Sequence, residues 1–133
     1  MTAITFSVVG RPVPWARAGT NKGRHYTPPA QAAHMKALAW AAKAAGAKPQ
    51  AGAVDLEAAF ILEPPASWSK KAKAAALVGL VRPTSAPDAS NYTKILEDAL
   101  NGIAWLDDAQ VVSLRVSKSY GPQALTVVTV RRA

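Results

Sequence analysis

An apolar stripe between residues 92 and 103 constrains the fold of this chain more than any other feature of its sequence. Its side chains recur at spacings of three and four residues, so they share one face of an α-helix. They are Tyr92, Ile95, Leu96, Ala99 and Ile103. The segment 87–90 can begin this helix, and Gly102 ends it after about residue 100. A helix with one apolar face has to pack against another element, so the chain must build a core around this stripe.

The remaining segments predict two further helices and four strands. Alternating apolar residues and turn-forming boundaries predict the strands, which span residues 4–9, 54–62, 109–118 and 124–130. The predicted helices span residues 27–45, with Thr27 as N-cap, and residues 69–79. Residues 10–26 are rich in proline and glycine and are predicted to form a loop. This order of elements predicts one α+β domain over residues 1–133, with helices packed on one mixed β-sheet.

The composition excludes several classes of protein. The chain has no cysteine, which rules out thiol catalysis, zinc ribbons and disulfide scaffolds. Its longest stretch without Asp, Glu, Lys or Arg is twelve residues, 119–130, whereas a membrane-spanning helix needs about 20 apolar residues. No signal-peptide pattern, Walker loop, GxGxxG, GxSxG or HExxH motif is present. We therefore expect a cytoplasmic protein that neither enters a membrane nor uses a nucleotide cofactor.

The charge of the chain is unevenly distributed. Lys and Arg number 16 against 8 Asp and Glu, a net charge of +8, and this favours nucleic acid as a partner. The segment 88–108 nevertheless holds five acids and one lysine, a net charge of −4. Carboxylates repel a phosphate backbone unless a divalent cation lies between them, as in metal-dependent nucleases. From charge alone, the alternative that these acids only solvate a surface helix and a turn stays equally open.

The acidic segment contains residues that can carry chemistry, and each also has a simpler explanation. Asp88 precedes the helix, where an acid commonly caps exposed N–H groups. Asp107 and Asp108 precede a strand, where paired aspartates commonly form a turn. Because a helix–turn–strand unit can bring such carboxylates together, they are also candidate ligands of Mg²⁺. Lys94 either stabilises charge on a phosphate or pairs with an acid one turn along the helix.

Basic residues in the loop and in two helices predict a surface that binds phosphates. They are Arg11, Arg17, Lys22, Arg24, Lys36, Lys43, Lys70, Lys71 and Lys73. Trp15, Tyr26 and Trp68 are candidates for stacking on unpaired bases, although packing inside the protein is the simpler explanation. His25 and His34 lack the spacing of zinc ligands and are interpreted as incidental, with His25 a potential phosphate contact.

The motif PDASNYTKILEDAL over residues 87–100, followed by NGIAWLDDAQVV over 101–112, resembles the signature of the RusA family of Holliday junction resolvases. That signature is approximately D-x-D-N-x-x-K-x-x-x-D-A-L, a short link, and W-x-D-D-x-Q-V. The N-terminal strand and the segments GRPVPWAR and YTPPAQ also resemble phage-type members of the family. The resemblance therefore covers most of the chain, and its specific part is the second half.

The resemblance implies a homodimeric, Mg²⁺-dependent endonuclease of a bacterium or a phage-infected cell, with Mn²⁺ as a substitute metal. Such an enzyme binds four-way DNA junctions and cuts two opposing strands symmetrically during recombination and repair. The resemblance implies that Asp88 and Asp108 are catalytic metal ligands, with Asp107 assisting, and that Lys94 is the catalytic lysine of the motif. Asn91 matches a motif position with a supporting role.

One position departs from the family pattern. Ser90 stands where the most familiar member has a second aspartate. Serine is neutral and a weaker Mg²⁺ ligand, so a water, Asp98 or Asp107 would have to complete the coordination shell. Three hypotheses follow: a junction resolvase, a branched-DNA nuclease of broader specificity, and a junction-binding protein with weakened catalysis. A protein-interaction domain without a nucleic-acid role fits poorly with a charge of +8.

Overall fold

The computed structural model describes residues 3–16, 19–21 and 23–133. Its main feature is a mixed β-sheet of four strands. These are β1 (Ala3–Val9), β4 (Val54–Leu62), β5 (Val111–Tyr120) and β6 (Leu125–Arg132). Their order in the sheet is β1-β6-β4-β5. β4 and β5 run parallel, whereas β6 is antiparallel to both β1 and β4. The parallel pair matters for function because the connection between its strands carries the acidic segment 88–108.

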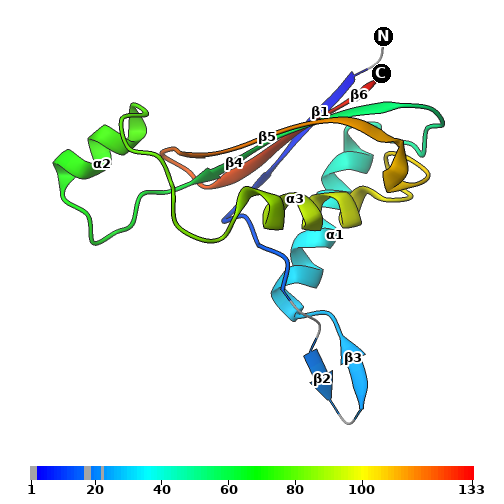
Figure 1. Cartoon of the computed structure of the whole chain (residues 1–133), viewed down its shortest axis with the longest axis horizontal. Helices are drawn as coiled ribbons and strands as arrows, with labels where there is room; N and C mark the ends of the chain where they lie inside the picture. The colour runs from blue at the N-terminus through cyan, green and yellow to red at the C-terminus, as the bar shows by residue number, and fades with distance from the viewer. Residues whose placement is uncertain (1–2, 17–18, 22) are drawn as a thin grey trace.

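Helices cover one face of this sheet. α1 (Pro29–Ala44) packs against β1, and α3 (Ala89–Leu100) lies against β4, β5 and α1. α2 (Lys70–Leu77) stands apart from the body of the molecule at the end of two long connections (Figure 1). This arrangement confirms the predicted α+β fold, with helices packed on one mixed sheet. No helix in the described part of the chain is long and apolar enough to cross a membrane.

The core lies between the sheet and the two packed helices. Alternate residues of β4 and β6 point toward the helices and are buried, while their neighbours are partly exposed on the opposite face. The apolar stripe of α3 is buried as predicted, except that Ile103, beyond the helix end, is only partly buried. The largest fully buried side chains include Trp105, Phe60, Leu38, Leu56, Ile95, Leu96 and Leu100. The apolar side of α3 is therefore fixed against α1 and the sheet, which leaves its polar side available for the site.

Three local predictions were wrong in detail. Within the segment predicted as a loop, β2 (Gly19–Asn21) and β3 (Arg24–Tyr26) form a small antiparallel hairpin. α1 begins one residue later than predicted, because Pro28 and not Thr27 occupies the N-cap position. The turn after Trp105 contains a short 3₁₀ helix, η1 (Asp108–Gln110), so β5 begins at Val111. Each difference concerns a proline-rich or turn-rich segment, where hydrophobic periodicity gives no signal.

His34 on α1 makes the stability of the protein depend on pH. Burial lowers the pKa of its imidazole below 6.5, so the folded state favours the neutral ring and the unfolded state binds a proton more readily. Stability from this group is therefore complete above pH 6.5 and is lost as the pH falls through the lowered pKa of the folded state. We expect urea midpoints to fall less between pH 7.5 and about pH 5 in His34→Gln than in wild type. Equal falls in both proteins would contradict this role.

Candidate active site

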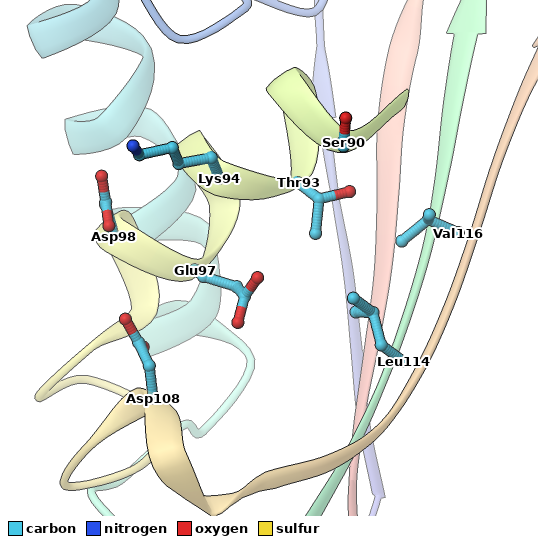
Figure 2. A pocket seen from close by; sticks show the side chains of 8 residues that line it. All are labelled: Ser90, Thr93, Lys94, Glu97, Asp98, Asp108, Leu114 and Val116. Carbon is cyan, nitrogen blue, oxygen red and sulfur yellow. The ribbon is translucent and has the colours of Figure 1, made fainter. Parts of the chain in front are cut away.

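A pocket of about 330 Å³ lies between α3 and the beginning of β5. Five of its residues come from α3: four lie on its polar side, and Thr93 is buried. The remaining three come from the start of η1 and from β5. Figure 2 shows all eight side chains: Ser90, Thr93, Lys94, Glu97, Asp98, Asp108, Leu114 and Val116. The pocket thus brings together acidic residues that the connection between α3 and β5 separates by ten positions or more.

Three carboxylates give this pocket a strongly acidic character. The Asp108 carboxylate is turned toward α3, near Glu97 and Asp98 (Figure 2). Burial raises the pKa of Glu97 above 4.5, and the charges of Asp108 and Asp98 raise it further. Burial also raises the pKa of Asp98, as does Asp108, while Lys94 lowers it. Burial is the larger cause of both shifts, and repulsion among the negative charges adds to it. A cation among these carboxylates would relieve that repulsion.

Asp108 is held in place by the core. The indole Nε1–H of Trp105 donates a 2.7 Å hydrogen bond to Asp108 Oδ1, and Trp105 is fully buried. The chain reaches this position because Gly102 adopts φ +79°, a left-handed conformation that glycine accepts without steric cost. The N–H of Gly102 then donates to the carbonyl of Trp105 at 2.8 Å. The tight turn therefore buries the tryptophan and aims one oxygen of Asp108 at a fixed point.

Gln110 anchors the same turn to a distant loop. Its amide nitrogen donates to the carbonyls of Gln50 and Gly52, each at 2.8 Å. Its amide oxygen accepts from the backbone N–H groups of Leu106 and Asp107, also at 2.8 Å. All four bonds use the side chain of one residue. This gives a physical reason for glutamine in the W-x-D-D-x-Q-V pattern.

Lys94 lies at the rim of the pocket beside an aromatic ring. Its Nζ is 3.9 Å from the centroid of the Trp15 ring. The backbone N–H of Trp15 also donates to the Asn91 carbonyl at 3.1 Å, so the segment before the β2–β3 hairpin is attached to α3. A cation over an aromatic face is attracted by the ring quadrupole. Trp15 therefore restricts the position of the lysine, a contact that sequence alone did not indicate.

The structure places Asp107 outside the pocket. Asp107 is the N-cap of η1, and its Oδ2 accepts a hydrogen bond from the backbone N–H of Ala109 at 3.1 Å. Of the two residues that were candidates to complete the coordination shell, Asp98 lines the pocket and Asp107 does not. The direct geometric support for a role beside Asp108 therefore falls on Asp98.

Asp88 is exposed at the N-cap position of α3 and does not line the pocket. Its side chain makes no capping hydrogen bond, so the simple capping explanation does not account for it. Asp88 and Asp98 are ten residues apart, about 15 Å along an ideal helix. Among the described residues, no group of three His, Cys, Asp or Glu side chains is already close enough to hold one metal ion.

The other predicted site residues are distributed around the same helix. Ser90 lines the pocket, whereas Asn91 is partly buried and lies outside it. Glu97 was not among the predicted site residues, and the structure adds it to the pocket. Its position on the polar face of α3, one residue from Asp98, was the available signal. The sequence did not indicate that this face of α3 lies close to Asp108.

The predicted phosphate-binding residues lie on several elements. Arg17 and Lys22 lie outside the described residues, and Arg24 belongs to β3. The remaining side chains are exposed or partly exposed: Arg11 after β1, Lys36 and Lys43 on α1, and Lys70, Lys71 and Lys73 on α2. The basic residues of α2 therefore lie on a helix that stands apart from the body of the molecule, beyond one end of the sheet (Figure 1).

Comparison with known proteins agrees with the motif and the fold. A sequence model of the family described as endodeoxyribonuclease RusA matches residues 9–131. The uncharacterized protein YqaN of Bacillus subtilis (strain 168) is 37% identical over 139 aligned residues, covering 98% of this chain and 97% of YqaN. The family match begins at the last residue of β1 and includes both packed helices and every residue of the acidic pocket. The chain therefore belongs to the RusA family of endodeoxyribonucleases.

Proposed function

We propose that this protein is a Mg²⁺-dependent endonuclease that resolves four-way DNA junctions by paired, symmetric nicks. The observation that carries the proposal is the pocket that holds Asp108, Glu97, Asp98 and Lys94. The net charge of +8 favours attraction of DNA. The acidic groups that share one pocket favour a local site that binds a cation. Membership of an endodeoxyribonuclease family supports cleavage of DNA. Junction specificity comes from the motif resemblance.

The donor set of the pocket fits Mg²⁺ in chemistry. Mg²⁺ prefers oxygen ligands and keeps several waters, so one or two protein carboxylates and a substrate phosphate suffice to bind it. Asp108 and Asp98 would supply those carboxylates, with Glu97 close by and the Ser90 hydroxyl as a weak donor. Asp88 is the ligand that the family motif predicts, but it lies outside this pocket at the start of α3 and would not bind the same ion as Asp98. When bound, the metal supplies a Lewis acid and lowers the pKa of a water.

Each of the other residues has a role that its position supports. Trp105 orients Asp108 through the 2.7 Å hydrogen bond, and Gln110 fixes the turn that carries both. Lys94 stabilises negative charge on the phosphate under attack, and Trp15 limits the positions of its ammonium group. The lysines of α1 and α2 bind the DNA backbone without reading its sequence. A homodimer would place one pocket on each of two opposing strands, in keeping with the symmetry of the junction.

The test is cleavage of a labelled synthetic four-way junction and of a linear duplex with the same sequences, with and without Mg²⁺. We expect paired nicks in opposing strands of the junction alone, and only with Mg²⁺ or Mn²⁺. Equal cleavage of junctions, flaps and nicked duplexes would show a nuclease of broader specificity. Tight junction binding with no cleavage in either metal would overturn the proposal and favour a junction-binding protein with weakened catalysis. Light scattering of the free protein separately tests the dimer.

Mg²⁺ is expected to stabilise the folded protein even without DNA. A ligand at 100 times its Kd adds about 2.7 kcal/mol to the free energy of unfolding, which raises the Tm of a domain of this size by about 5–10 °C. Asp108→Asn should abolish most of this shift. Asp55→Asn, which alters a partly buried acid on β4 outside the pocket, should retain it. A shift that survives in Asp108→Asn would place the metal elsewhere.

Replacing Lys94 with alanine is expected to slow the cleavage step about a hundredfold at saturating DNA, because one stabilising positive charge is lost. Trp15→Leu should slow it only about fivefold, since a cation–π contact contributes about 1 kcal/mol or less at exposed sites. Single-turnover rates measure both effects. Lys48→Ala, which removes an exposed lysine far from the pocket residues in sequence, serves as the control. If Lys94→Ala cleaved at the wild-type rate and bound DNA more weakly, Lys94 would act in binding alone.

A further inference from the structure

A second and larger cavity, of about 740 Å³, lies on the other side of the beginning of α3. It lies where β1 and β4 end and where β5 passes to β6, beside the two connections that carry α2 (Figure 1). Its volume is within the range of small-molecule binding sites, about 300–1,000 Å³. Its lining includes Arg11, Glu63, Trp68, Pro87, Tyr92 and Tyr120. None of them belongs to the acidic pocket.

Aromatic rings form much of the wall of this cavity. Trp68 and Tyr120 pack edge to face, with ring centroids 5.5 Å apart and an interplanar angle of 66°. In such a pair the ring that presents its edge keeps both of its faces free of its partner. Tyr92 is held from behind by Phe60, with centroids 5.2 Å apart. Tyr92 is only 3% exposed, so the partly exposed rings of Trp68 and Tyr120 are the ones that a nucleobase can reach. Aromatic faces bind nucleobases by stacking, independently of base identity.

Two charged groups accompany the rings. Burial raises the pKa of the Tyr92 phenol, and the charge of the exposed Arg11 partly offsets this rise. Glu63 Oε1 accepts a long, 3.4 Å hydrogen bond from the backbone N–H of Ala124. No other described residue donates a hydrogen bond to this carboxylate. A guanidinium binds phosphate, and a carboxylate accepts from the amino group of a base. The aromatic rings, the Arg11 guanidinium and the Glu63 carboxylate therefore match the base plane, the phosphate and the base amino group of one nucleotide.

The cavity and the acidic pocket share their supporting elements. Tyr120 of the cavity and Val116 of the pocket lie on the same face of β5, four residues or about 13 Å apart. Between them, Lys118 Nζ donates to the carbonyls of Ser85 at 2.8 Å and of Pro87 at 3.0 Å. This fixes the segment that lines the cavity and leads into α3. A DNA strand with its phosphate at the acidic pocket would therefore reach the cavity within a few nucleotides.

We propose that this cavity binds an unstacked nucleobase of branched DNA, close to the phosphate that is cut. The position of that base relative to the cut rests on the proposed function, whereas the binding of an unstacked base does not. Fully paired duplex DNA keeps its bases stacked and cannot fill the cavity without losing that stacking energy. The site would therefore favour branched over linear DNA without reading sequence.

The test uses photocrosslinking without Mg²⁺, so that no strand is cut. A four-way junction carries 5-iododeoxyuridine at one of the positions one to four nucleotides from the branch point, and mass spectrometry identifies the crosslinked residue. We expect crosslinks to Trp68 or Tyr120 from the junction and at least tenfold fewer from a linear duplex with the same label. Crosslinks only to Trp40, which is exposed on α1, would overturn the proposal. The proposal would also be overturned if a second copy of the chain covered Trp68 and no crosslink to Trp68 formed.

Affinity measurements give a second, independent readout. Trp68→Leu should weaken junction binding about five- to a hundredfold, the range reported for loss of one stacked base, and duplex binding much less. Trp68→Phe keeps an aromatic face and should recover most of the loss, which separates stacking from folding. Trp40→Leu should leave the ratio of junction to duplex affinity unchanged. An unchanged ratio in Trp68→Leu would contradict the proposal.

These outcomes are separable from those of the proposed function. If the wild-type protein crosslinks through Trp68 but never cuts junctions, the base-binding cavity is supported and the nuclease proposal is wrong. If the wild-type protein cuts junctions symmetrically and Trp68→Leu binds them with wild-type affinity, the nuclease proposal is supported and the base-binding cavity is wrong.

Discussion

Asp108→Asn is expected to lower the rate of junction cleavage about a thousandfold, because a metal ligand at the reacting phosphate is lost. Asparagine keeps an oxygen that can accept the hydrogen bond from Trp105, so the fold should be preserved. Junction affinity should stay equal or increase, since a negative charge near the phosphate backbone is removed. Single-turnover cleavage and binding without metal measure the two quantities separately.

Asp55→Asn is the matched control for this experiment. It makes the same chemical change in β4, on the face of the sheet opposite the core, and should leave the cleavage rate within about twofold of wild type. Cleavage by Asp108→Asn at the wild-type rate would remove Asp108 from the catalytic site. A parallel loss of affinity and rate would instead indicate a role in DNA binding.

Trp105→Ala is expected to lower the free energy of unfolding by about 3–5 kcal/mol, because a large, fully buried side chain is removed from the core. The substitution also removes the only described hydrogen bond to the Asp108 side chain. Urea unfolding measures the loss. Trp40→Ala, in which the original side chain is 76% exposed, should change stability by about 0.5 kcal/mol or less. Similar losses in both variants would contradict the burial difference between the two residues.

Trp105→Phe provides a milder variant that should still fold. It retains an aromatic ring in the core and removes the indole N–H. Cleavage by folded Trp105→Phe should be slower than wild type, because Asp108 loses the donor that orients it. Full activity in this variant would show that the hydrogen bond serves stability and not the site.

The helix that carries the site could be predicted because its signals are local. The apolar spacing from Tyr92 to Ala99 specifies which face is buried, and Gly102 specifies where the helix ends. The polar face, with Lys94, Glu97 and Asp98, then follows from the period of 3.6 residues. The same reasoning gave the strands of the sheet and the α+β class. In the 10–26 segment, by contrast, short irregular pieces left the β2–β3 hairpin without a recognisable pattern.

The division of roles among the acids depended on tertiary structure. Asp107 and Asp108 are adjacent and identical in sequence, yet one caps η1 and the other lines the pocket. What separates them is the burial of Trp105 and the anchoring of Gln110 to residues 50 and 52, which are distant in the chain. Likewise, nothing near Trp68 in sequence indicates that Tyr120 completes its cavity.

The sequence by itself determined the core face of α3, the order of the strands along the chain, the basic character of the protein and the residues of the family motif. These depend on composition and on spacings within about ten residues. Only the tertiary structure decided which carboxylates share a pocket, that Trp15 lies against Lys94, and that an aromatic cavity adjoins the site. Those relations arise where the parallel β4–β5 pair and the packing of α3 bring distant segments together, and no local pattern encodes such distances.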